Sequence, residues 1–95
     1  MRPSGSDSAS ALEEAILALC RAEGAARTIC PTDAAKAHAA QRGEGELGWR
    51  GHLSEVRRAA VQLAEAGRLV IYRKGKPVDP RDFRGVYRLG LPRVD

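Results

Sequence analysis

The chain has 95 residues, which is enough for one small domain with a modest hydrophobic core. Residues 1–47 carry 5 Arg or Lys against 7 Asp or Glu, whereas residues 48–95 carry 11 against 5, so the two parts have net charges of −2 and +6. No apolar run is long enough for a membrane span and no secretory signal core is visible, so a cytoplasmic protein without a membrane partner is expected.

The basic second part suits an anionic partner, because Lys and Arg side chains that neutralise phosphates release counterions. A different explanation of the composition is equally good. Arg outnumbers Lys 13 to 3 and Ala occurs 16 times, as a GC-rich genome would produce. Charge alone therefore leaves the partner open.

Residues 1–9 are rich in Ser with Gly and Pro and are predicted to be a disordered tail, which leaves residues 10–95 as a single domain. A first helix is predicted to begin at Ser10, which has capping-box spacing with Glu13, and to end at Gly24. The apolar residues of this segment recur at helical intervals: Leu12, Ile16, Leu19 and Cys20.

A short strand is predicted next, at residues 27–29. Pro31 then stands at a favourable first-turn position for a second helix, with Asp33 near its positive end. This helix is mostly alanine, and small side chains permit another helix to pack closely. A polar, glycine-rich connection, residues 41–48, follows.

A third helix is predicted over residues 49–66, with Gly67 ending it and Gly51 fraying its first turn. At 100° per residue, one side of this helix gathers the apolar positions Trp49, Leu53, Val56, Ala60, Leu63 and Ala64. The residues expected to form the domain core together are Leu53, Val56, Leu63, Ile16, Leu19 and Ile71.

Two strands are predicted at residues 69–73 and 86–91, because both runs are rich in branched and aromatic residues and a Pro/Gly-containing loop separates them. The expected order is αβααββ. This order predicts an α+β winged-helix fold, in which a three-helix bundle carries a C-terminal β-hairpin wing.

The chain also resembles a family of small bacterial proteins grouped as domain of unknown function 3253, over about residues 11–91. The most specific run is Lys74-Gly75-Lys76-Pro77-Val78-Asp79-Pro80, and the Ala-rich pieces are less specific. Other similar runs are residues 27–31, Trp49-Arg50, residues 56–60 and residues 63–67. The resemblance implies a winged-helix fold and no assigned activity.

Two surfaces are candidates for nucleic-acid binding. The outer face of the third helix presents side chains that can reach base edges, namely Ser54, Arg58 and Gln62. The hairpin presents cations that can hold phosphates, namely Arg73, Lys74, Lys76, Arg81 and Arg84.

Each surface has an alternative interpretation. The hairpin residues also suit a solvated loop in which Asp79 or Asp82 pairs with an arginine. On the helix, Glu55 and Glu65 share the outer face, and Glu55 has the spacing to pair with Arg58.

The cysteines and histidines give no metal prediction. Cys20, Cys30, His38 and His52 are separated by nine, seven and thirteen residues, which matches no zinc-finger pattern. No metal or cofactor is expected. Cys30, directly before Pro31, suits a weak helix cap or alternatively a thiolate at a helix N-terminus.

Arg57 lies at the edge of the apolar stripe, and a structural role is predicted in which its guanidinium reaches a carboxylate or carbonyl groups. The alternative is an anion site formed with Arg88. Trp49 is predicted to anchor the core rather than to stack on a base.

No Gly-rich phosphate loop, nucleophile elbow or carboxylate pair is present, so the chain is expected to be a binding module and not an enzyme. Two functions remain. One is duplex DNA binding through the third helix and the basic wing. The other is a protein-protein interaction module without nucleic-acid activity. The sequence fixes neither the partner nor the oligomeric state.

Overall fold

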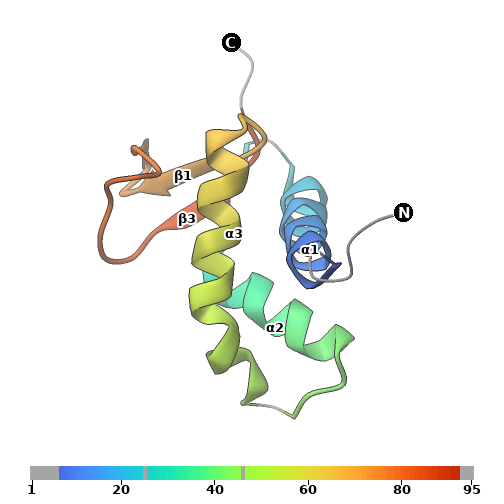
Figure 1. Cartoon of the computed structure of the whole chain (residues 1–95). Helices are drawn as coiled ribbons and strands as arrows, with labels where there is room; N and C mark the ends of the chain where they lie inside the picture. The colour runs from blue at the N-terminus through green and yellow to red at the C-terminus, as the bar shows by residue number, and fades with distance from the viewer. Residues whose placement is uncertain (1–6, 25, 46, 93–95) are drawn as a thin grey trace.

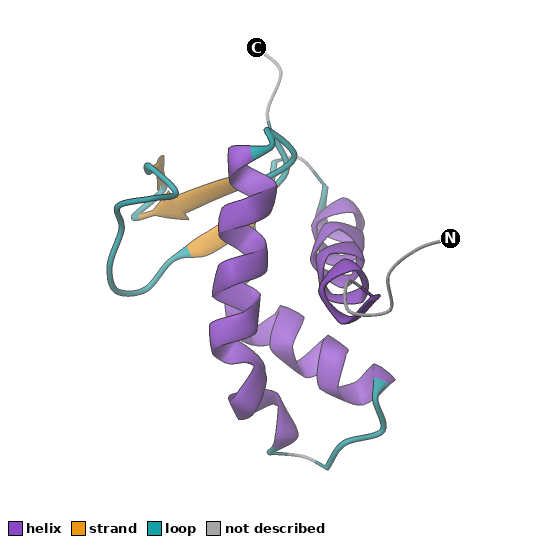
Figure 2. Ribbon diagram, viewed as in Figure 1, coloured by secondary structure: helices purple, strands orange, loops and turns teal. Residues whose placement is uncertain are grey.

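A computed structural model describes residues 7–24, 26–45 and 47–92. The helices come first and a small antiparallel sheet follows, so the predicted α+β fold with a C-terminal hairpin wing is confirmed (Figures 1 and 2). The elements are α1 (Asp7–Glu23), α2 (Pro31–Gln41), the 3-10 helix η2 (Gly48–His52), α3 (Leu53–Glu65), β1 (Val70–Arg73), β2 (Lys76–Pro77) and β3 (Arg88–Gly90).

Helix α1 begins at Asp7, three residues before the predicted start at Ser10. Residues 1–6 of the predicted tail lie outside the described residues. The predicted stop is confirmed, because α1 ends directly before Gly24.

Helix α2 begins as predicted. Cys30 is its N-cap residue and Pro31 occupies the first turn. The Asp33 carboxylate accepts a 3.1 Å hydrogen bond from the backbone N–H of Cys30, which satisfies a donor at the helix start. The buried alanines Ala34 and Ala35 bring α2 close to its neighbours.

The predicted third helix has two parts. Its first turn is the 3-10 helix η2, and the α-helix itself starts at Leu53. The prediction that Leu53 is buried is wrong, because 37% of its surface is exposed. Leu53 is the first residue of α3, at the junction with η2, so the periodicity assumed for one continuous helix from Trp49 does not hold there. Trp49 is half-buried against the core.

The sheet has the strand order β2-β1-β3, with both pairs antiparallel. Strand β2 was not predicted. It pairs with β1 through a two-residue turn in which Lys74 has φ 53° and Gly75 has φ 81°, the backbone that a tight hairpin requires. The last strand is shorter than predicted, because it covers only Arg88–Gly90 and leaves Val86 in the loop, 82% exposed.

The short strand predicted at residues 27–29 is present only as one antiparallel bridge between Ile29 and Leu89. Ile29 N–H donates to the Leu89 carbonyl at 2.7 Å, and Leu89 N–H donates back at 2.9 Å. The connection between α1 and α2 is therefore attached to the far edge of the sheet.

The core lies between the three helices and the inner face of the sheet. Val56, Leu63, Ile16 and Ile71 are buried as predicted, whereas Leu19 is only half-buried and Leu17 takes the deeper position on α1. Figure 1 shows the sheet and its long loop on one side of α3, with α1 and α2 on the other. One long face of α3 therefore remains open to solvent, next to the wing.

Candidate nucleic-acid interface

The open face of α3 carries the predicted base-reading residues. Ser54, Arg58 and Gln62 are all exposed and are spaced four residues apart, so they lie on one side of the helix. Within the described part of the chain, none of these three side chains forms a hydrogen bond or an ion pair. These side chains are therefore free to contact a ligand.

The two acidic residues on this helix have partners. Glu55 Oε1 lies 2.8 Å from His52 Nδ1, so its partner is this histidine and not Arg58, the residue that its spacing suggested. Glu65 Oε2 lies 2.5 Å from Arg81 Nε. The Arg81 guanidinium compensates the Glu65 carboxylate, and His52 compensates Glu55 when it is protonated, which reduces the repulsion of an incoming phosphate.

Arg81 and Arg84 lie in the loop between β2 and β3, which packs along α3. Phe83, between them, is buried, while both arginines are exposed. Arg81 is tied to α3 through Glu65, and the carboxylate of Glu65 raises the pKa of Arg81. Arg84 makes no ion pair within the described residues and is the freer cation of the two.

Arg57 has the structural role that was predicted for it. Its Nη2 donates a 2.8 Å hydrogen bond to the Phe83 carbonyl oxygen, and its guanidinium lies 4.0 Å from the centroid of the Phe83 ring. Arg88 is similarly engaged, because its Nε donates to Thr28 Oγ1 at 2.6 Å and its Nη2 to the Thr28 carbonyl oxygen. Both arginines therefore hold groups of the protein itself, a backbone carbonyl in each case.

The three cations at the tip of the hairpin, Arg73, Lys74 and Lys76, do not form a single site. Arg73 and Lys76 are cross-strand partners on one face of the hairpin, and Arg73 Nε donates to the Val86 carbonyl oxygen at 3.0 Å. Lys74 instead lines a hollow of about 460 Å³ together with Tyr72 and Arg88. Successive side chains of a strand point to opposite faces, so the basic run in the sequence is divided between them.

An apolar hollow of about 540 Å³ lies beside the start of α3 and was not predicted. Its lining includes Leu53, Val86 and Tyr87, with Cys30 and Arg57 at its sides. Burial raises the pKa of Tyr87. The sequence signal was Val86, an apolar residue among the polar positions of the loop, but the strand prediction had placed it inside the sheet.

Cys20 and Cys30 are free thiols. Across residues 7–24, 26–45 and 47–92, no three His, Cys, Asp or Glu side chains are placed to share a metal ion. No helix in those ranges combines the length and the apolar character that a bilayer span needs.

The fold and its open face define a small α+β domain with a hairpin wing. The family model described as "Protein of unknown function (DUF3253)" matches residues 9–92, which is nearly the whole chain, so the protein belongs to this family. No curated protein matches the chain.

Proposed function

We propose that this protein is a cytoplasmic binding module, not an enzyme, that binds duplex DNA through the open face of α3 and the wing. The observation that carries the proposal is the pairing of charges on α3. Glu55 and Glu65 are held by His52 and Arg81, while Arg58 on the same helix has no partner within the described residues. The helix therefore offers phosphate an unpaired cation between two carboxylates that already have hydrogen-bond partners.

The wing supplies the sequence-independent part of the binding energy. Lys74 is exposed in the tight turn, Lys76 is exposed directly after it, and Arg84 is exposed in the loop that packs on α3. Such side chains neutralise backbone phosphates and orient the duplex, whereas Arg58 and its neighbours on α3 are the groups that contact base edges. This division of roles is the usual one for a helix beside a wing.

The test is a salt series of binding to a random-sequence duplex. The logarithm of the association constant is expected to fall linearly with the logarithm of salt concentration, with a slope of about −0.9 for each phosphate neutralised. Binding that is undetectable even at low salt, where screening is weakest, would refute the proposal.

A protein-protein interaction is the second candidate, and the apolar hollow beside α3 favours it. Leu53 and Val86 are both exposed there, and neighbouring apolar side chains of this kind suit a partner's helix or extended segment. A partner released by Val86→Asp but retained by the double variant Lys74→Ala, Lys76→Ala would favour this candidate. The opposite pattern would favour DNA.

A further inference from the structure

His52 lies where η2 meets α3, between two carboxylates from different segments. Its Nδ1 is 2.8 Å from Glu55 Oε1 in the first turn of α3. Its Nε2 is 2.8 Å from Glu44 Oε1, in the connection that follows α2. Only 12% of the His52 side chain is exposed. We call this arrangement of Glu44, His52 and Glu55 the His52 bridge.

The two short distances determine which form of the ring fits. A carboxylate oxygen only accepts hydrogen bonds, and a neutral imidazole has a single N–H. A neutral ring would therefore direct the lone pair of one nitrogen at a carboxylate oxygen 2.8 Å away. Only the imidazolium donates to both Glu55 and Glu44. The hydrogen bond to Glu55, and then that to Glu44, raises the pKa of His52 accordingly.

The other charged groups around the bridge are consistent with a protonated His52. Arg42 Nε lies 2.8 Å from the second oxygen of Glu44. The hydrogen bond from Arg42, followed by that from His52, lowers the pKa of Glu44. Two cations thus face two carboxylates, and the cluster is balanced only while His52 carries its proton.

Helix α2 contributes His38, which packs edge-on against the His52 ring with 4.7 Å between centroids. His38 is only 3% exposed, and both of its ring nitrogens lack a hydrogen-bond partner within the described residues. Burial, with the neighbouring His52 as the next cause, lowers the pKa of His38. The pKa values of the two histidines are therefore shifted in opposite directions, that of His38 downward and that of His52 upward.

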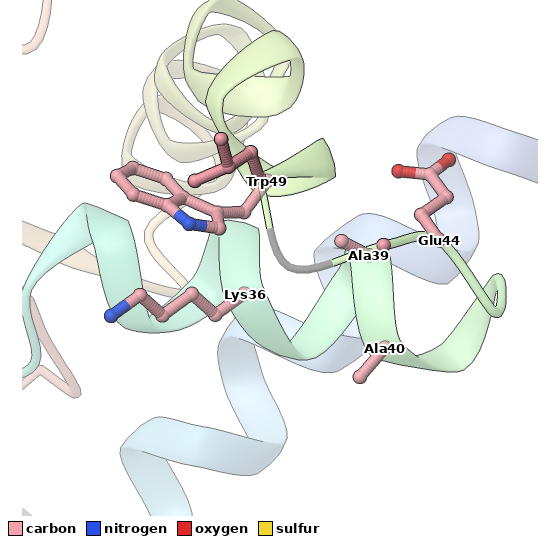
Figure 3. A pocket seen from close by; sticks show the side chains of 7 residues that line it. Lys36, Ala39, Ala40, Glu44 and Trp49 are labelled. Carbon is pink, nitrogen blue, oxygen red and sulfur yellow. The ribbon is translucent and has the colours of Figure 1, made fainter.

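The backbone is shaped to hold Glu44 in the bridge. A Cβ atom at Gly48 would lie 2.8 Å from the Glu44 Cβ and 2.9 Å from its Oε1. Glu44 also lines a hollow of about 570 Å³ between α2 and η2, which it shares with Trp49 and Lys36. Figure 3 shows Lys36 along α2 beneath the Trp49 indole, with Glu44 on the other side of the hollow.

We propose that the His52 bridge is a pH-operated connection between the segment that follows α2 and the start of α3. While His52 is protonated, it joins Glu44 to Glu55. When it loses the proton, one of the two hydrogen bonds is lost and the ring no longer joins Glu44 to Glu55. The hollow beside Trp49 then changes shape. This proposal rests on the geometry of the bridge alone and does not require DNA binding.

The direction of the pH dependence follows from the two groups. The pKa of His52 is raised in the folded protein, so its contribution to stability is complete below the ordinary value of about 6.5 and is lost as pH rises through the folded value. The pKa of Glu44 is lowered, so its contribution is lost as pH falls through that lowered value. The bridge is strongest between the two folded-state values.

The chain contains two histidines and one tryptophan, which makes the proposal measurable without labels on other residues. In an NMR titration of the ring nitrogens, one histidine is expected to have a midpoint above about pH 6.5. The other is expected to have a midpoint below that value. Trp49 fluorescence is expected to change over the same pH range as the higher midpoint. Two midpoints at or below the ordinary value would overturn the proposal.

Variants assign the higher midpoint to the bridge. Glu44→Gln and Glu55→Gln are each expected to lower it toward about 6.5, because each removes one carboxylate that stabilises the imidazolium. Gly48→Ala is expected to act like Glu44→Gln by displacing the Glu44 side chain. The matched control is Glu14→Gln, which removes a carboxylate on α1 that pairs with Arg68 and is expected to leave the midpoint unchanged.

The fluorescence response separates the bridge from a general charge effect. Glu44→Gln is expected to abolish the pH-dependent change at Trp49, and circular dichroism checks that the variant remains helical. If Glu44→Gln and Glu55→Gln leave the midpoint where it is in the unmodified chain, His52 does not bridge them and the proposal fails. The titration of the unmodified protein decides the question even if a variant does not fold.

Discussion

Arg57 attaches the long loop of the wing to α3, because its guanidinium both donates a hydrogen bond to the Phe83 carbonyl oxygen and lies over the Phe83 ring. The two residues are 26 positions apart in the chain. This contact holds the loop that carries Arg81 and Arg84 along the helix, so the position of these cations depends on Arg57.

Replacing Arg57 with Ala is therefore expected to destabilise the domain by about 1 to 3 kcal/mol, the combined loss of a charged hydrogen bond and a cation–π contact. Chemical denaturation measures the change. Arg58→Ala is the matched control, because the Arg58 side chain, next to Arg57 on the same helix, has no partner in the described structure. Its loss is expected to change the free energy of unfolding by no more than about 0.5 kcal/mol. Equal effects of the two variants would contradict this role for Arg57.

Two leucines of α3 test which side of the helix faces the core. Leu63 is 2% exposed and Leu53 is 37% exposed. Leu63→Ala is expected to cost about 2 to 5 kcal/mol of unfolding free energy, because it leaves a cavity. Leu53→Ala is expected to cost less than about 1 kcal/mol, since much of its surface is already in contact with water. Denaturant titration measures both losses. A larger loss of unfolding free energy for Leu53→Ala than for Leu63→Ala would mean that the other side of α3 faces the core.

The two thiols are expected to differ in reactivity. Burial raises the pKa of Cys20 to about 11, so almost no thiolate forms at neutral pH, and the residue is 1% exposed. Cys30 is half-buried beside the apolar hollow. A thiol-specific reagent is expected to modify Cys30 alone in the folded protein and both residues in denaturant. Rapid modification of Cys20 under native conditions would show that α1 opens readily.

Charge variants test the DNA-binding surface. The double variant Lys74→Ala, Lys76→Ala is expected to weaken binding almost equally for all sequences and to reduce the salt slope by about two. Arg58→Ala is expected to alter sequence preference instead. Binding isotherms at several salt concentrations distinguish the two signatures, and an unchanged slope in the double variant would remove the wing from the interface.

A variant of Glu65 tests the same surface through a change that is expected to strengthen DNA binding. Glu65→Gln removes the carboxylate that holds Arg81, so both the repulsion and the competition for Arg81 decrease. Tighter DNA binding is expected, with the largest gain at low salt. Glu14→Gln, on α1 and away from this face, serves as the control for the change in net charge. A gain of equal size in the control would mean that only total charge matters.

The sequence predicted the helices and the wing well, because these depend on local patterns. Capping residues and periodicity located the start of α2 at Pro31 and the ends of α1 and α3 near Gly24 and Gly67. The burial of Leu53 was predicted wrongly, since the change from 3-10 to α-helix at that residue alters the angle between neighbouring side chains. Strand β2 was missed because two residues leave no periodic signal.

The candidate site was harder to predict, since it depends on contacts between distant segments. The structural role predicted for Arg57 is confirmed. An arginine beside an apolar stripe usually directs its guanidinium to a nearby carboxylate or carbonyl group, so its position on the helix was a sufficient signal. The pairing of Arg81 with Glu65 and of His52 with Glu44 joins residues 16 and 8 positions apart across loops, and no spacing rule indicates such pairs. The proposed roles of Ser54, Arg58 and Gln62 stay predictions.

The attachment of the Thr28 and Ile29 segment to β3 has a consequence for the synthesis of the protein. Thr28 and Arg88 are hydrogen-bonded although 60 positions separate them, and Ile29 pairs with Leu89 beside them. While the chain emerges from the ribosome, β1 has no partner on its β3 side until residues 88–90 have been made. A chain terminated before Arg88 would therefore keep an open strand edge and an uncovered Ile71, and it would be prone to aggregate rather than fold.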